Sequence, residues 1–217
     1  MASTAYTLVI GNKIGSSWSL RPWLLMKQAG IPFVETLVEL RQHTTSPDIQ
    51  KHSPAGLVPI LKHGDLVIWD SLAIAEYLNE RHPDKQLWPA DPALRARARS
   101  VAAEMHAGFR DLRMNLPMDF LGHGLAPLAG EGWQKDIRRI VQIWRDARSG
   151  SKAGGPFLFG GFSIADAMYA PVASRFTSYT VDLKAFGDDG SAEAYRAMMM
   201  ALPPMRDWAA DSKPWAS

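Results

Sequence analysis

The first 80 residues alternate between strand-like and helix-like segments, and this alternation most constrains the fold. Short apolar runs rich in β-branched residues predict strands at residues 7–10 and 33–40. Between them, residues 20–29 carry apolar side chains at helical spacing, and Gly30 supplies a stop signal. Two strands separated by one helix predict a parallel pair joined by a crossover.

A second pattern follows, in which two strands precede a helix. Residues 58–62 and 66–69 are β-like runs around a short loop that contains glycine, so they predict a hairpin. Asp70 or Ser71 can cap a following helix that reaches about Arg81. The combined order is β-α-β and then β-β-α, and a thioredoxin-like sheet is the compact arrangement that uses it.

The chain changes character after a proline-rich segment. Residues 81–92 contain three prolines and predict a linker. Beyond it we find only helical apolar patterns, at residues 93–114, 133–147, 164–176 and 191–202. The sequence therefore predicts a small α/β domain, a linker and an all-α domain, with bounds of 1–82, 83–92 and 93–217.

Composition excludes several classes of function. The chain has no cysteine, so disulfide scaffolds, thiolate metal sites and cysteine nucleophiles are excluded, and any sulfur chemistry must use a ligand's sulfur. Its six histidines are scattered and predict no metal site. A net charge of +2 gives no indication of nucleic-acid binding. No apolar run approaches the roughly 18 residues of a membrane span, and no signal peptide is evident, so we expect a cytoplasmic protein.

A cluster of serines lies between the first strand and the first helix. Because Pro22 fits a helix only in its first turn, the helix is expected to begin near Trp18 or Ser19. Serines at such a place are commonly helix N-caps, and this explanation alone would suffice for them.

Four motifs occur in one order along the chain. They are Ser-Ser-Trp-Ser-Leu-Arg at 16–21, Val-Pro at 58–59, Asp-Ser at 70–71 and Phe-Ser-Ile-Ala-Asp at 162–166. Together they resemble the cytosolic glutathione S-transferases over essentially the whole chain, and the first motif is most similar to the zeta class. The resemblance implies an α/β thioredoxin-like N-terminal domain, an all-α C-terminal helical domain, and activation of glutathione for attack on a small electrophile.

By this resemblance, Ser16 matches the catalytic serine of the family because it lies five residues before Arg21. A free thiol has a pKa of roughly 8.5, and a hydrogen bond donated to the thiolate lowers it. A hydroxyl at a helix N-terminus can donate that bond, and the helix end favours the same negative charge. Ser17 and Ser19 remain alternatives for this role.

The resemblance also implies a set of residues that hold glutathione. Val58 and Pro59 resemble the cis-proline element, whose backbone pairs with the cysteinyl part of glutathione; a proline that starts a strand is the alternative. Asp70 and Ser71 match the pair that holds the γ-glutamyl group, a role compatible with capping the helix. Leu57 stands where many relatives have lysine or glutamine, so the glycyl carboxylate needs another partner, for which we suggest His43.

The second substrate is expected between the two domains. Side chains that could line its pocket are Trp18, Phe109, Arg113, Met114 and Arg175. Core packing and solvated arginines are the alternative explanations. Ser163 and Asp166 have the spacing of a capping box, which we assign to folding.

Two other functions remain open. One is a glutathione-dependent isomerase of the maleylacetoacetate type, or a dehalogenase; Trp18 in place of the zeta-class cysteine argues against the isomerase. The other is a non-catalytic binding or interaction protein with this fold, which Leu57 favours. The family further implies glutathione as co-substrate, no metal, a homodimer and a role in detoxification, without nucleic-acid or membrane partners.

Overall fold

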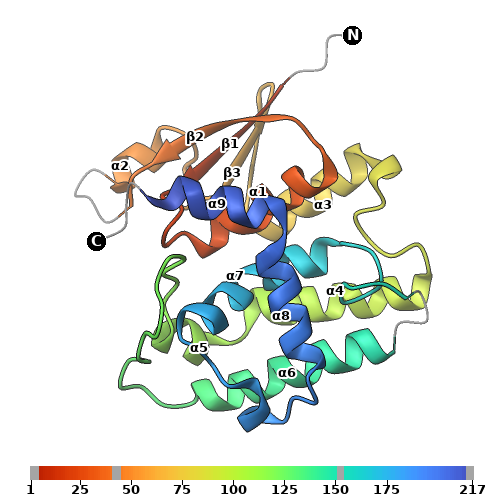
Figure 1. The fold of residues 1–217 in the computed structure, drawn as a ribbon. Coiled ribbons are helices and arrows are strands. Elements are labelled where there is room, and N and C mark those ends of the chain that lie inside the picture. Colours follow the sequence, from red (N-terminus) through yellow and green to blue (C-terminus); the bar gives the residue numbers. More distant parts are fainter. Residues whose placement is uncertain (1–4, 41–44, 151–153, 214–217) are drawn as a thin grey trace.

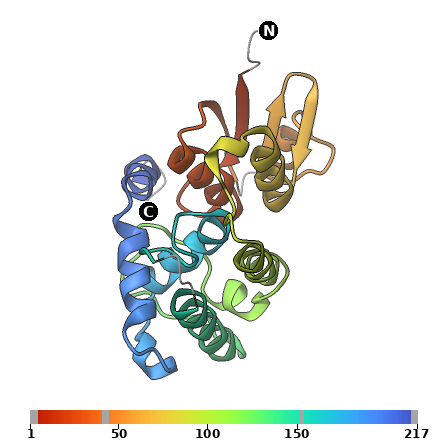
Figure 2. The same ribbon diagram turned by 90° about the vertical axis from the view of Figure 1, so that its right-hand side faces the viewer.

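The computed structural model describes residues 5–40, 45–150 and 154–213. An N-terminal α/β domain lies above a helical C-terminal domain, and Figures 1 and 2 show the two stacked on each other. This arrangement confirms the predicted fold class. No helix within the described ranges is long and apolar enough to cross a membrane.

Within the described residues, four strands of the N-terminal domain form one mixed sheet in the order β2-β1-β3-β4. The parallel pair of β1 and β2 is the predicted crossover unit, and β3 runs antiparallel to both β1 and β4. The predicted hairpin is therefore present as β3 and β4. The strands are β1 (Tyr6–Gly11), β2 (Phe33–Val38), β3 (Ile60–His63) and β4 (Leu66–Trp69).

Alternating side chains of β1 supply two apolar layers. Leu8 and Ile10 pack into the main core with α1 (Ser17–Ala29) and α3 (Ser71–Arg81). Val9 points to the other face, where it packs with Ile49 of α2 (Thr45–Gln50). Helices thus cover both faces of the sheet, and consecutive residues of β1 are apolar because both of its sides are buried.

The first helix begins earlier than expected. It starts at Ser17, so Pro22 is its sixth residue and lies inside the helix, beyond the first turn. Proline has no backbone N–H, so the helix lacks one hydrogen bond there. Burial of every residue from Ser19 to Met26 provides the packing that offsets this loss.

The helical domain is built around one buried helix. All residues of α7 (Ile164–Ser178) are buried except Thr177, and α1, α4 and α8 pack against it. The remaining helices of this half are α4 (Pro92–Ala107), α5 (Arg110–Asn115), α6 (Trp133–Ser149), α8 (Ser191–Ala201) and α9 (Pro203–Ser212), with the short turns η1 (Pro83–Lys85) and η2 (Leu183–Phe186).

The long helix predicted over 93–114 is in fact two helices. The backbone N–H of Gly108 closes α4 on the carbonyl of Glu104. Phe109 then adopts a left-handed conformation with φ of 58°, which turns the chain into α5. The apolar spacing continues across this break, so periodicity alone could not reveal it.

The last helix returns to the N-terminal domain, where α9 lies beside α1 (Figure 1). The Lys13 ammonium lies 2.8 Å from a carboxylate oxygen of Glu35 and 2.6 Å from one of Asp211. Trp208 of α9 donates its indole N–H to the Lys13 carbonyl at 2.8 Å. Helix α9 therefore holds the loop that leads from β1 to Ser16.

Candidate functional site

A cavity of about 320 Å³ opens on the N-terminal domain where three separate segments meet. They are the start of α1, the turn before β3 and the junction of β4 with α3. The peptide bond between Val58 and Pro59 in this wall is cis. The lining residues are Trp18, Leu57, Val58, Pro59, Trp69, Asp70 and Ser71.

Ser16 occupies the N-cap position of α1, two residues before Trp18, and is not itself among the residues that line the cavity. Its side chain does not cap the helix; the hydroxyl is buried and donates to the Ser19 hydroxyl at 2.7 Å. Ser19 also accepts the backbone N–H of Gly11 at 3.1 Å. The first turn of α1 has no acidic residue, so the positive end of the helix dipole is available to an anion.

Asp70 and Ser71 begin α3 at the opposite wall. One oxygen of Asp70 caps the helix by accepting the Leu72 N–H at 2.8 Å, and the other lies 3.1 Å from Nε2 of His106. Ser71 is buried, and its hydroxyl has no hydrogen-bond partner among the described residues. A buried hydroxyl without a partner is unfavourable, so this wall offers an unused donor and acceptor to a ligand.

His106 of α4 connects the two domains at the cavity edge. Its ring meets Trp18 edge-on, with centroids 5.3 Å apart. Burial lowers its pKa, and Arg21 and Arg113 lower it further, although Asp70 opposes the shift. The imidazole is therefore neutral near pH 7.

Three arginines gather behind Trp18. The guanidinium carbons of Arg21 and Arg113 lie 4.1 and 4.8 Å from the Trp18 ring centre. Burial, with Arg113 and Arg175 nearby, holds the pKa of Arg21 well below its usual range. Two nitrogens of Arg21, Nε and Nη1, have no partner among the described residues. These arginines make the region beside Trp18 favourable for negative charge.

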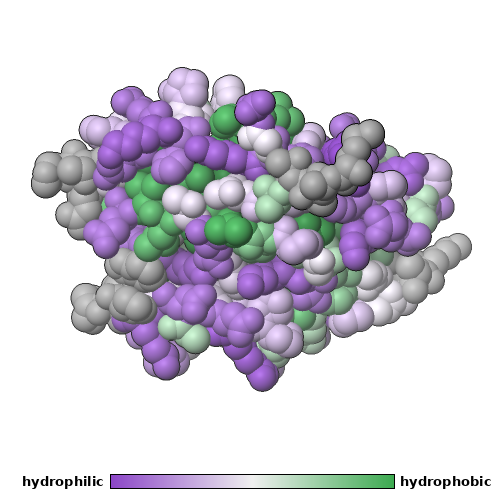
Figure 3. Space-filling view, turned by 90° about the horizontal axis from the view of Figure 1, so that it is seen from above, coloured by the Kyte–Doolittle hydropathy of each residue, from purple (hydrophilic) through white to green (hydrophobic). Residues whose placement is uncertain are grey.

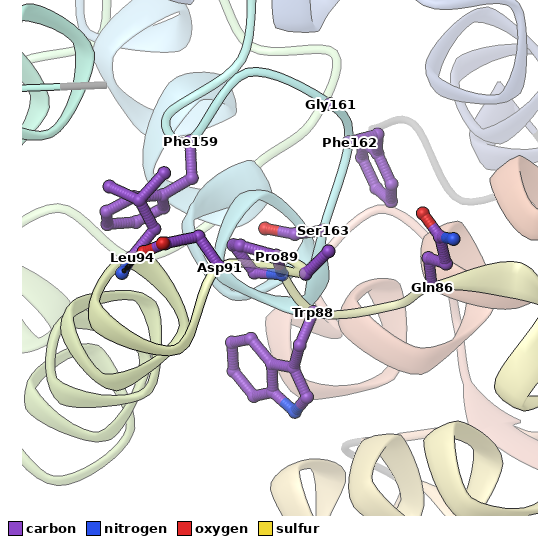
Figure 4. A pocket seen from close by; sticks show the side chains of 10 residues that line it. Gln86, Trp88, Pro89, Asp91, Leu94, Phe159, Gly161, Phe162 and Ser163 are labelled. Carbon is purple, nitrogen blue, oxygen red and sulfur yellow. Dashed lines mark hydrogen bonds between the residues drawn. The ribbon is translucent and has the colours of Figure 1, made fainter. Parts of the chain in front are cut away.

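A second cavity, of about 250 Å³, lies where the linker meets the turn before α7 (Figure 4). Three of its polar side chains are already engaged. Asp91 caps α4 through the Leu94 N–H, Ser163 bonds to Asp166, and Trp88 donates its indole N–H to Glu76. The cavity therefore offers few hydrogen-bonding groups to a ligand, and we interpret it as part of the contact between the two domains.

The surface above the sheet carries apolar side chains among polar ones, as Figure 3 shows from above the N-terminal domain. At the β4 edge of the sheet, Leu66 and Trp69 are both 47% exposed.

In the part of the chain that the structure describes, no group of three or more His, Cys, Asp or Glu side chains could hold a metal ion.

Comparison with known proteins decides the family. The model for the glutathione S-transferase N-terminal domain matches residues 15–81, and the model for the C-terminal domain matches residues 92–211. The chain belongs to the glutathione S-transferase family.

Individual relatives agree with this assignment. The transferase is 30% identical over 177 residues to glutathione S-transferase 1 of Dianthus caryophyllus, covering 78% of this chain and 77% of that one. It is 28% identical over 173 residues to a probable maleylacetoacetate isomerase of Caenorhabditis elegans, covering 78% of each. A solved glutathione transferase homologue from Burkholderia, with bound glutathione, shares the fold with a TM-score of 0.71 at 23% identity, covering 97% of this chain and 99% of that one.

The transferase fold brings some of the predicted site residues together and separates others. Trp18, Val58, Pro59, Asp70 and Ser71 share the first cavity. Leu57 stands at its rim, 69% exposed, where a charged side chain would meet a ligand.

The residues predicted for a second-substrate pocket are more dispersed. Arg113 lies against Trp18, but Met114 is 63% exposed and Phe109 is buried in the core. Arg175 is buried and donates to the carbonyls of Leu116 and Pro171. The prediction for His43 lies outside the described residues.

Sequence reasoning missed three residues of this site. His106 was grouped with the scattered histidines, and Arg21 served only to locate Ser16 within its motif. Trp69 was read as the end of a strand, although it lines the cavity. Arg21 and Trp69 had local signals, because Arg21 belongs to the first motif and Trp69 directly precedes Asp70. His106 had none, since its role depends on contacts with Asp70 and Trp18 across the fold.

Proposed function

We propose that this transferase binds glutathione in the first cavity and stabilises its thiolate with the Ser16 hydroxyl, for attack on a small electrophile. The observation that carries this proposal is the placement of a buried serine hydroxyl at an uncapped helix N-terminus, two residues before Trp18 in the wall of that cavity. A hydroxyl donor and a helix dipole act on the same atom, and both lower a thiol pKa.

The cavity walls suit the rest of the glutathione molecule. The Ser71 hydroxyl and the Asp70 carboxylate lie together at the start of α3, where they can meet the carboxylate and ammonium of the γ-glutamyl group. Val58 lines the same cavity and would meet the cysteinyl part. Leu57 leaves the glycyl carboxylate without a charged partner at that position, which predicts modest affinity.

In this mechanism the thiol releases its proton to solvent and Ser16 keeps its own. The Ser16 hydroxyl donates to the sulfur throughout, and it is therefore a hydrogen-bond donor without a role as a base. The sulfur forms the new bond while the electrophile loses its leaving group or accepts the electron pair. Holding both reactants in one cleft supplies the remainder of the rate.

Titration of bound glutathione tests the proposal. We expect an ultraviolet thiolate signal that appears at least one pH unit below the free-thiol pKa of roughly 8.5. S-methylglutathione, which cannot ionise at sulfur, is the control and should give no signal. Binding with an unshifted thiol, or no binding, would overturn the proposed chemistry and favour the non-catalytic alternative.

Ser71→Ala should weaken glutathione binding. The buried hydroxyl is expected to bond a carboxylate, and such a charged hydrogen bond contributes about 1.5–3 kcal/mol, so Kd should rise at least about tenfold. Calorimetry on both proteins measures this change. Because the free protein loses an unpaired hydroxyl, the variant should be no less thermally stable; unchanged affinity would remove Ser71 from the site.

A second candidate is glutathione-dependent isomerisation of a substrate that carries a carboxylate. The guanidinium groups of Arg21 and Arg113 beside Trp18 favour it, with Arg175 close to both, since together they create a positive potential there. Comparing turnover of maleylacetoacetate with that of haloacids and of an uncharged aryl halide would separate isomerase, dehalogenase and general transferase activities.

Several further expectations remain predictions. They are the linker bounds 83–92, the homodimer, the cytoplasmic location and a role in detoxification. Light scattering at several protein concentrations would test the homodimer.

A further inference from the structure

The proton of the Ser16 hydroxyl points at a neighbouring serine, Ser19. In the structure Ser16 Oγ donates to Ser19 Oγ, 2.7 Å away, and both serines are buried. A hydroxyl has a single proton. While that proton points at Ser19, Ser16 cannot donate to a sulfur in the cavity.

Ser19 is held in place from its other side. Its oxygen accepts the Gly11 N–H at 3.1 Å, and Gly11 ends the central strand β1. Leu40 packs tightly over Gly11, where a β-carbon would come within 2.5 Å of a Leu40 methyl group. The Gly11 N–H that donates this hydrogen bond therefore lies in a closely packed part of the sheet.

We propose that Ser19 is a positioning residue that turns the Ser16 hydroxyl toward the glutathione sulfur, an inference that rests on the proposed function. A thiolate accepts hydrogen bonds and donates none, so its arrival requires the Ser16 proton to point at sulfur. The Ser16 oxygen then accepts the Ser19 proton, while Ser19 continues to accept from Gly11. Two hydroxyl rotations accomplish the change, and no proton moves from one oxygen to another.

The reversed series of hydrogen bonds makes the Ser16 hydroxyl a stronger donor to the sulfur. Each hydrogen bond in the series Gly11 N–H to Ser19, Ser19 to Ser16, and Ser16 to sulfur polarises the next. Burial of both hydroxyls keeps water from competing for the intermediate bonds. Ser19 thus acts on the thiolate through Ser16 and does not touch it.

Ser19→Ala tests this role through the pKa of the bound thiol. We expect that pKa to rise by about 0.5–1 unit, the effect of one neutral hydrogen bond, with a smaller rise than in Ser16→Ala. Ser212→Ala is the matched control, since Ser212 is also a buried helical serine, bonded to the Trp208 carbonyl. The control should leave the thiol pKa unchanged.

A double variant gives the sharper test. In a Ser16→Ala background, adding Ser19→Ala should change the thiol pKa no further, because the path through Ser16 is already absent. An additive second shift would overturn the proposal and indicate direct contact between Ser19 and sulfur. An unshifted pKa in Ser19→Ala alone would also overturn it, while leaving the Ser16 chemistry intact.

Affinity for S-methylglutathione separates this role from support of the fold. That ligand has no thiolate, so Ser19→Ala and the wild type should bind it equally. A parallel loss of both ligands would show that Ser19 only maintains the cleft. If Ser19→Ala does not fold, Ser19→Cys keeps a weak donor in a side chain of similar shape. It should give an intermediate pKa once the signal of its own thiol, recorded without glutathione, is subtracted; a wild-type value would contradict the relay.

Discussion

Ser16→Ala is expected to lower kcat/KM for glutathione conjugation by about 10²–10³-fold, the effect of removing one donor from a developing or standing negative charge. The pKa of the bound thiol should rise by about 1–2 units, because a hydrogen bond to a charged group contributes about 1.5–3 kcal/mol. Glutathione affinity at low pH, where the thiol is protonated in both proteins, should change little. The loss should therefore appear in kcat more than in binding.

A variant of the neighbouring Ser17 tests whether Ser16 is the residue that bonds to the sulfur. Ser17 is the first residue of α1 and is only partly exposed, so it is the nearest competitor for the sulfur. The same titration on Ser17→Ala separates the two. A thiolate signal that survives in Ser16→Ala and disappears in Ser17→Ala would move the catalytic role by one residue.

Asp166→Ala should destabilise the protein by about 3–5 kcal/mol, because several buried donors lose their acceptor and each unsatisfied group costs about 1–3 kcal/mol. Asp166 is fully buried and accepts from the backbone N–H groups of Leu158 and Ser163 and from the hydroxyls of Ser163 and Tyr195. The variant leaves these donors unpaired at the start of the central helix α7. Thermal unfolding should show a fall in Tm of roughly 10 °C.

An exposed cap provides the control. Asp91 is exposed and caps α4 by accepting one backbone N–H from Leu94. Asp91→Ala should cost only about 1 kcal/mol. Equal losses in the two variants would mean that burial and the extra donors at Asp166 add nothing.

The pH dependence of Asp166 has a definite sign. Burial raises its pKa to about 6 despite the donors around it. The folded state therefore binds this proton more tightly than the unfolded chain, where the pKa is about 3.9. Its contribution to stability is complete below about pH 4 and is lost as the pH rises through about 6.

Comparison with Asp166→Asn isolates this contribution. The difference in unfolding free energy, wild type minus variant, should be larger at pH 5 than at pH 8 by about 1 kcal/mol, as linkage requires. Denaturant titrations at both pH values measure it. A difference that does not change with pH would mean that the donors keep the carboxylate fully ionised.

Much of the N-terminal domain was predictable because its signals are local. A continuous apolar run located the strand around Leu8, which is buried on both faces, and helical apolar spacing located the helix around Leu24. The start of α1 was predicted one or two residues too late, because local propensity places Pro22 in the first turn. Packing of the whole helix against the sheet and α7 overrode that preference.

The helical domain was predicted less well where the chain turns without a local signal. The break at Gly108 and Phe109 interrupts a periodic apolar pattern, and a left-handed phenylalanine depends on its tertiary surroundings. The final helix α9 was not predicted, although Pro203 and Pro204 are its first two residues and proline is suited to the first positions of a helix.

The sequence by itself determined the family, the order of elements and the motif residues that meet in one cavity, because these depend on neighbours along the chain. Only the tertiary structure decided that His106 contacts Asp70, that Arg21 lies against Trp18, and that Ser19 bonds to both Ser16 and Gly11. Only the contact between His106 and Asp70 joins segments remote in sequence, and the others join residues at most eight positions apart. Side-chain periodicity records which face is buried without recording the partner, so it could reveal neither kind of contact. The chemistry of the site depends on those partners, which folding alone brings together.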